Sequence, residues 1–304
     1  VMHIADDSSP AGMQSQRRPV LYEVGSFGEY AQRNILIRGD AQDALEALRR
    51  TPPFADEYVE GVKVAYLDPP FNTGNTNRHY RDRAPRQEWL NMLRRILVQL
   101  KNLLTEDGSV WLHLNDAEQH RARVILDEVF GPKSFVATII WERTNHPRPN
   151  ANPIAIRHDY IHVYRKSAAF AITPPMREAT SVDSVWDLSD VGSTQDAVRE
   201  NRNLFGSTFA TPKPERLLAR IIGLTTEPGD VVLDCFAGSG TTAAVAHKMG
   251  RRWVAVEVNE STMRDYLQPR LCAVLAGTDN GGITPGINWS GGGFTRFDCI
   301  DNRY

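Results

Sequence analysis

The sequence has few cysteines, no long apolar run and almost no net charge. Its three cysteines, Cys235, Cys272 and Cys299, are too few and too scattered for a disulfide framework or a cysteine-rich zinc site. No uninterrupted apolar run approaches the roughly 18 residues that span a bilayer. Residues 1–19 are polar and lack the apolar centre of a secretory signal. We therefore expect a protein of the reducing cytoplasm without membrane contact.

The formal net charge is −2, from 35 basic and 37 acidic side chains, so the whole-chain charge gives no indication of a nucleic-acid partner. Basic residues nonetheless gather in two islands, at residues 78–86 and 142–166. Such islands can contact phosphates or can be solvated surface loops, and charge alone leaves both interpretations open. The candidate contacts in these islands are Arg78, Arg81, Arg83, Arg86, Arg143, Arg148, His158 and Tyr160.

Segments with strand and helix periodicity alternate over most of the 304 residues. Short apolar or alternating runs predict strands at 34–38, 62–67, 109–114, 136–141, 160–164, 231–236 and 253–258. Helical spacing predicts helices at 41–50, 93–104, 117–130, 213–224, 241–248 and 261–275. This alternation predicts an α/β fold with a doubly wound, mostly parallel sheet.

A glycine-rich turn joins the strand predicted at 231–236 to the helix predicted at 241–248. The backbone of such a turn can approach a ligand closely, and Glu257, at the end of the next strand, can accept both hydroxyls of a ribose. The glycine spacing also satisfies the dinucleotide fingerprint, which keeps a nicotinamide-dependent oxidoreductase as an alternative. The acidic Asp234 before the turn suits a ligand with an ammonium group better than a pyrophosphate. This favours an adenosyl cofactor.

A second motif, Asp68-Pro69-Pro70-Phe71, follows the strand predicted at 62–67. The Asp68 carboxylate and the Pro69 carbonyl offer two acceptors for an exocyclic NH2 group, and Phe71 can stack on a base taken out of a helix. Two such hydrogen bonds localise the nitrogen lone pair, and alignment with a sulfonium methyl then permits transfer. The alternative is a proline-stiffened turn with Phe71 packed in the core.

Together the two motifs resemble those of the DNA amino-methyltransferases that use S-adenosyl-L-methionine. Their order, with DPPF ahead of FAGSGTT, is similar to the β class, and the resemblance covers residues 33–275. The string at 68–75, the segments 88–92 and 158–160 and the tail at 281–294 are similar to the modification subunits of type III restriction systems. Those subunits are considerably longer, so we expect a compact methylase and leave a restriction partner open.

The resemblance implies a Rossmann-like class I methyltransferase fold with S-adenosyl-L-methionine as cofactor. It puts Asp40 near the cofactor adenine, Glu257 on the ribose and Lys213 near the cofactor carboxylate. The other implied cofactor contacts are Asp234, Phe236, Ala237, Gly238, Ser239, Gly240, Thr241 and Thr242. The implied catalytic residues are Asp68, Pro69, Pro70 and Phe71.

The same pattern divides the chain into five expected segments. Residues 1–30 form a polar extension, 31–142 the catalytic half and 211–276 the cofactor-binding half. Between the halves, residues 143–210 lose clear periodicity, and we interpret them as an inserted target-recognition element. Residues 277–304, rich in Gly and Asn, are expected to form an irregular tail.

We expect base-flipping methylation of adenine N6 in double-stranded DNA, because an acidic first residue in the tetrapeptide is commoner in the adenine enzymes of the family. Cytosine N4, which presents nearly the same donors, is the main alternative. An RNA methyltransferase and a catalytically silent DNA-binding module are more distant ones. A homodimer is a further expectation, as is association with the nucleoid. His113 and His120 lack a ligand constellation, so no metal site is expected, and Cys235 is interpreted as a small core residue.

Overall fold

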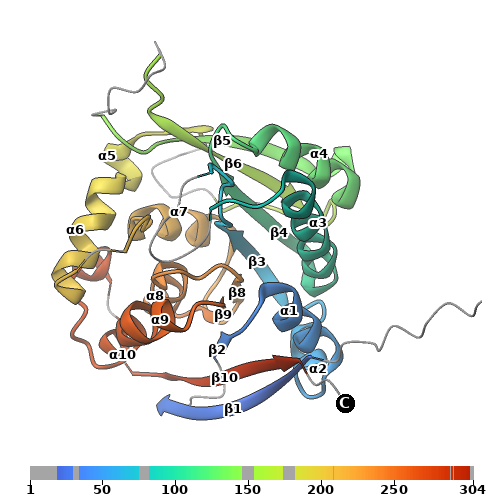
Figure 1. The fold of residues 1–304 in the computed structure, drawn as a ribbon. Helices are drawn as coiled ribbons and strands as arrows, with labels where there is room; N and C mark the ends of the chain where they lie inside the picture. Colours follow the sequence, from blue (N-terminus) through green and yellow to red (C-terminus); the bar gives the residue numbers. More distant parts are fainter. Residues whose placement is uncertain are drawn as a thin grey trace, which may run out of the picture.

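The computed structural model describes residues 19–29, 34–74, 82–145, 154–173, 182–207, 209–287, 289 and 291–301. Within these ranges the chain folds into one ten-stranded sheet with helices on both faces (Figure 1). The strand order is β1-β10-β2-β9-β8-β3-β4-β6-β5-β7. The neighbouring strands from β10 through β2, β9, β8 and β3 to β4 pair in parallel. At the edges, β1 pairs antiparallel with β10, and β6 pairs antiparallel with both β4 and β5. The expected doubly wound, mostly parallel α/β fold is confirmed.

All seven predicted strands are present, although β4 begins five residues earlier than predicted, and β1, β7 and β10 are strands that the sequence did not predict. The strands are β1 Pro19–Gly28, β2 Ile35–Arg38, β3 Val62–Leu67, β4 Leu104–Leu114, β5 Phe135–Glu142, β6 His158–Arg165, β7 Val185–Trp186, β8 Val231–Asp234, β9 Arg252–Glu257 and β10 Gly293–Asp301. On β2, Ile35 and Ile37 enter one hydrophobic core and Leu36 enters the other. Successive side chains of a strand point to opposite faces, so one short apolar run contributes to both layers.

Helices cover each face of the sheet (Figure 1). One core packs under α1 Ala41–Arg50, α2 Phe54–Tyr58, α3 Arg86–Leu103 and α4 Gln119–Phe130. The other packs under α7 Glu215–Thr225, α8 Thr241–Lys248 and α10 Gln268–Leu275. The short α9 Glu260–Thr262 and the π-helical η3 Met263–Leu267 lead into α10, while α5 Leu188–Val191 and α6 Thr194–Phe205 follow β7. The 3-10 turns are η2 Pro132–Ser134 and η4 Thr284–Gly286.

Two terminal expectations are wrong for part of their residues. Residues 19–28 of the expected polar extension form β1, and residues 293–301 of the expected irregular tail form β10. The two strands pair antiparallel, and β10 also pairs with β2, so partners far apart in sequence stabilise both. The rings of Phe27 and Phe294 stack with centroids 4.8 Å apart. The remaining segment divisions stay predictions, although β6, inside the proposed recognition element, belongs to the main sheet.

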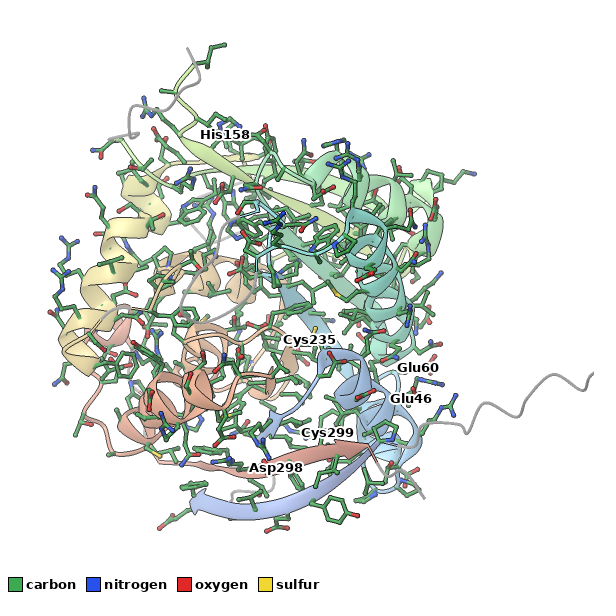
Figure 2. All side chains as sticks on the ribbon, viewed as in Figure 1. Glu46, Glu60, His158, Cys235, Asp298 and Cys299 are labelled. Carbon is green, nitrogen blue, oxygen red and sulfur yellow. The ribbon has the colours of Figure 1, made fainter. Side chains whose placement is uncertain are left out.

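No helix within the described residues is long and apolar enough to cross a membrane. The three cysteines are free, and Figure 2 shows Cys235 near the middle of the molecule and Cys299 on β10. Cys235 is 3% exposed within the core under α1–α4, as the sequence predicts, and burial raises the pKa of its thiol well above the ordinary value.

Candidate active site

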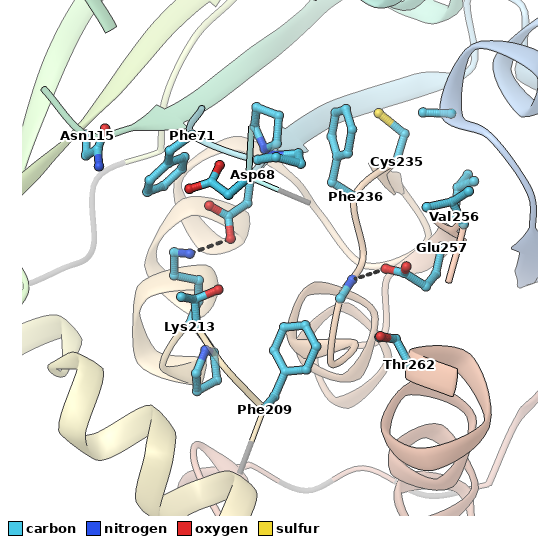
Figure 3. Close-up of a pocket in the computed structure, with 18 of the residues that line it drawn as sticks. Asp68, Phe71, Asn115, Phe209, Lys213, Cys235, Phe236, Val256, Glu257 and Thr262 are labelled. Carbon is cyan, nitrogen blue, oxygen red and sulfur yellow. Dashed lines mark hydrogen bonds and ion pairs between the residues drawn. The ribbon is translucent and has the colours of Figure 1, made fainter. Parts of the chain in front are cut away.

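A cavity of about 480 Å³ opens at the carboxyl ends of the central parallel strands (Figure 3). The segments after β2, β3, β8 and β9 all reach it, because neighbouring parallel strands end at the same edge of a sheet. Both sequence motifs therefore line one cavity. The sequence-predicted residues in its wall are Asp40, Asp68, Pro69, Pro70, Phe71, Arg143, Lys213, Phe236, Gly238 and Glu257.

Asp68 forms an ion pair with Lys213 at the cavity wall (Figure 3). The Oδ2 atom of Asp68 accepts from the Lys213 ammonium, while the buried Oδ1 atom has no hydrogen-bond partner among the described residues. The ammonium also lies 5.5 Å from the centroid of the Phe71 ring, within cation–π range. A carboxylate oxygen with unused acceptor capacity beside an aromatic ring suits a planar ligand that carries an NH2 group.

The turn that carries Asp68 and Phe71 is fixed from outside. The indole Nε1 of Trp89, on α3, donates to the Pro70 carbonyl at 2.7 Å. After the turn, the Asn72 and Thr73 amides donate to the Asp82 carboxylate, at 2.6 and 3.2 Å. The Asp82 side chain is 6% exposed. Neither Trp89 nor Asp82 has a predicted role in the sequence, and only the fold brings them to the turn.

The glycine loop closes on the end of the neighbouring strand β9. The Gly238 amide donates to Oε2 of Glu257 at 2.9 Å, and the Asn259 amide donates to Oε1 at 2.8 Å. Burial raises the pKa of Glu257. Gly238 has φ +51°, and a Cβ there would lie 3.2 Å from the Phe209 ring. A larger residue at this position would strain the backbone and press on Phe209, which also lines the cavity.

Asp234 is buried behind the loop, 3% exposed, rather than in the cavity wall. Its oxygens accept from the Phe236 amide at 2.9 Å and from the Thr242 hydroxyl at 2.6 Å. Burial raises the pKa of Asp234 to about 7. Its direct role in binding a ligand stays a prediction. The other predicted loop residues are also buried and lie outside the cavity wall. They are Ala237, Ser239, Gly240, Thr241 and Thr242.

Asp159, in the cavity wall, has no role assigned from the sequence, and it joins the predicted contact Arg143 to a buried group behind the wall. The Asp159 carboxylate accepts from Nε of Arg143 at 3.1 Å and lies 3.5 Å from Nε2 of the fully buried His113. His113 Nδ1 is 2.7 Å from the Tyr66 hydroxyl, and its ring lies 5.8 Å from that of Phe71. Although burial acts to raise it, the pKa of Asp159 is lowered by its contacts with His113 and Arg143.

The residues predicted to contact DNA differ in where they lie. Arg78, Arg81 and Arg148 lie outside the described residues. Arg83 and Arg86 are exposed, and Arg86 pairs with Glu118 at 3.1 Å.

On β6, His158 and Tyr160 contact each other at 3.0 Å and are not in the cavity wall. The Tyr160 hydroxyl donates to Asp116 at 2.8 Å, and Figure 2 shows His158 far from Cys235. Their part in DNA binding stays a prediction. No cluster of three metal-ligating side chains occurs within the described residues.

Residues 62–268 match the model of the N6_N4_Mtase family, described as DNA methylase. A Haemophilus influenzae protein named "Probable type III restriction-modification enzyme HindVI Mod subunit" is 24% identical over 86% of this chain and 53% of its own length. The StyLTI Mod subunit of Salmonella typhimurium is 23% identical over 69% of this chain and 49% of its own. The chain thus spans about half the length of these two relatives.

Two solved structures show the same fold. The cytosine-N4-specific PvuII DNA methyltransferase superimposes with a TM-score of 0.57 at 18% identity, covering 81% of this chain and 88% of that one. The complex of M1.HpyAVI with S-adenosyl-L-methionine superimposes with a TM-score of 0.52 at 19% identity, covering 78% and 99%. The expected Rossmann-like methyltransferase fold is confirmed.

Proposed function

The chain belongs to this DNA methylase family, and we propose that it transfers a methyl group from S-adenosyl-L-methionine to N6 of a flipped adenine in double-stranded DNA. One observation carries the proposal. The half-buried Asp68, whose buried Oδ1 atom is unpartnered among the described residues, shares a single cavity with Glu257 and the Gly238 loop. An acceptor for an amino group therefore lies next to a cradle suited to an adenosyl ligand.

The cofactor half of the cavity fits the proposed methyl donor. Asp40 follows β2, and Glu257 ends the adjacent β9, so both acids reach the wall beside the Gly238 loop. Glu257 would hold the ribose hydroxyls, and Asp40 would lie near the adenine. When bound there, the sulfonium group supplies an electrophilic methyl carbon.

The other half would hold the base. Oδ1 of Asp68 and the Pro69 carbonyl accept the two amino hydrogens, and Phe71 stacks on the ring. These hydrogen bonds localise the amino lone pair, so the nitrogen attacks the methyl carbon. The new C–N bond forms as the C–S bond breaks with its electron pair on sulfur, and the methylated nitrogen loses one proton to solvent.

Cytosine N4 is the second candidate target, because both bases offer the same two donors to Asp68 and Pro69.

We propose Arg83, Arg86 and Arg143 as phosphate contacts within the described residues. Since the relatives are named as Mod subunits, a restriction partner is a further proposal, together with a homodimer associated with the nucleoid. Light scattering with and without duplex DNA tests the dimer.

The first test is product analysis. The purified chain is incubated with S-adenosyl-L-methionine and varied unmethylated DNA, which is digested to nucleosides for mass spectrometry. N6-methyladenine is the expected product. N4-methylcytosine would keep the mechanism and overturn the base, whereas methylation of an RNA control alone would overturn the substrate class.

Asp68→Ala removes the carboxylate that accepts from the amino group. We expect it to abolish detectable methyl transfer, a loss of at least about 1000-fold, because an acceptor that acts in the transition state is lost. Affinity for S-adenosylhomocysteine, measured by calorimetry, should change less than about 3-fold, since Asp68 lies on the base side of the cavity. Retained transfer would contradict the assigned role.

A further inference from the structure

We propose that Lys213 is a positioning residue for Asp68, holding its carboxylate as an oriented anion for the target amino group. The inference rests on the proposed function. The resemblance implies a different task for Lys213, at the cofactor carboxylate, so the two assignments make opposite predictions.

The contact geometry favours the base side. The Lys213 ammonium is bound to Oδ2 of Asp68, which leaves Oδ1 as the oxygen without a partner among the described residues. A carboxylate tied at one oxygen rotates less, so the other oxygen keeps its direction. A hydrogen bond to an ionised acceptor is also stronger than one to a neutral acceptor. The same ammonium lies 5.5 Å from the Phe71 ring centroid. Lys213 thus contacts both side chains that would hold the base.

Charge balance at the cavity points the same way. The wall contains five acidic residues, Asp40, Asp68, Asp82, Asp159 and Glu257. Of these, Asp159 is paired with Arg143 and Asp68 with Lys213. Among the described wall residues, Arg143 and Lys213 are the two that are arginine or lysine. Lys213 is therefore the cation that balances Asp68. When a base enters and displaces water, an anion without such a partner would be costly to keep.

Lys213 is itself held in place. It lies between Pro212 and Pro214, directly before α7, and its side chain is 10% exposed. Two residues further on, Glu215, the first residue of α7, is 1% exposed and binds Lys248 of α8 and Arg270 of α10, at 2.9 and 2.8 Å. The helix that directly follows the Lys213 segment is thus fixed to α8, the helix that begins at the glycine loop. This framework fits a positioning role better than a flexible reach toward a ligand.

The first experiment compares Lys213→Met with Lys213→Arg and with Lys133→Met, the same substitution at an exposed lysine. We expect Lys213→Met to lower the single-turnover rate at saturating cofactor about 100-fold, the effect of a misplaced reacting group. On a logarithmic scale of the single-turnover rate, Lys213→Arg should recover at least a third of the loss that Lys213→Met causes. Lys133→Met should react at the rate of the unaltered chain.

Binding separates the two assignments. Calorimetry measures S-adenosylhomocysteine, which has the amino-acid carboxylate, and methylthioadenosine, which lacks it. We expect Lys213→Met to change both affinities less than about 3-fold. A fall of 10-fold or more for S-adenosylhomocysteine alone, with a normal rate at saturation, would overturn the proposal in favour of the cofactor assignment.

A double-mutant cycle tests the charge itself. Asp68→Asn keeps an oxygen acceptor and the side-chain shape but removes the charge that Lys213 balances. In the Asp68→Asn background, Lys213→Met should change the single-turnover rate less than about 3-fold. An equal 100-fold loss in both backgrounds would show that Lys213 acts without Asp68. If the unaltered chain methylates no DNA, the proposed function fails; if it does and Lys213→Met is equally fast, only this inference fails.

Discussion

At the scale of single residues, the catalytic turn depends on side chains outside residues 68–71. Trp89 donates to the Pro70 carbonyl, and Asp82 accepts from the two amides that follow Phe71. These hydrogen bonds restrict the conformations of the turn whether or not a base is bound. Such preorganisation lowers the cost of orienting Asp68 when a base arrives.

Trp89→Phe removes the indole donor and keeps most of the apolar packing. We expect the methyl-transfer rate to fall about 10-fold, because the Pro70 carbonyl loses its partner and the turn loosens, at a cost of about 1–3 kcal/mol. S-adenosylhomocysteine affinity should stay unchanged. The matched control is Trp186→Phe, since Trp186 is equally buried and donates to the Asp183 carbonyl at 2.7 Å, outside the cavity wall. Equal rate losses in both variants would mean that the effect is general destabilisation.

At the scale of elements, α6 and α7 meet at a carboxyl group with an unusual pKa. The Glu215 amide at the start of α7 donates to Glu200 of α6 at 3.1 Å. Burial raises the pKa of Glu200 to about 7, and the nearby Glu215 charge adds to the rise. Between the ordinary pKa of 4.5 and the raised pKa of about 7, Glu200 keeps its proton in the folded chain and loses it in the unfolded chain.

The stabilisation linked to this proton is present below pH 4.5 and is lost as the pH rises through about 7. Glu200→Gln keeps an acceptor for the Glu215 amide without a titrating group. We expect it to leave stability nearly unchanged at pH 5 and to raise it by roughly 1–3 kcal/mol at pH 8. Urea unfolding at both pH values measures this. Glu128→Gln, at an exposed residue of α4, should show no such pH-dependent gain; a gain at pH 5 equal to that at pH 8 would contradict the assignment.

At the scale of the whole molecule, the C-terminal segment completes the framework behind the site. The Ile283 amide donates to Oε2 of Glu215 at 3.0 Å, and Asp279 pairs with Lys248 at 2.9 Å. These contacts join residues 279–283 to α7, which follows Lys213, and to α8, which follows the glycine loop. The strand β10 that follows then lies beside β2, which leads to Asp40.

Gly282→Ala tests this connection. Gly282 has φ +56°, and a Cβ there would lie 2.2 Å from Oε2 of Glu215. We expect a loss of about 2–4 kcal/mol in the free energy of unfolding, because the backbone is strained and the buried ion pairs must shift. Gly286→Ala, where a Cβ meets nothing within 4 Å, should cost less than about 1 kcal/mol by the same thermal unfolding measurement. Similar losses in both variants would mean that the contact with Glu215 contributes little.

The sequence by itself determined the central strands and the two motifs. Apolar periodicity and the glycine and proline turns are local signals, so β3, β8 and the start of α8 lie where the sequence predicts. Parallel strands bind ligands at their carboxyl ends, and this rule predicts that Asp68, Gly238 and Glu257 lie at one site, as they do.

Only the tertiary structure decided which partners those residues have. Lys213 lies 145 residues from Asp68, and Trp89 lies 19 residues from Pro70. The strands β1 and β10 pair across almost the whole chain. Contacts of this kind leave no periodic trace in a single sequence, because they depend on how helices and strands pack in three dimensions. The motifs therefore predict the chemistry of the site, whereas the orientation and charge balance of its side chains depend on tertiary packing.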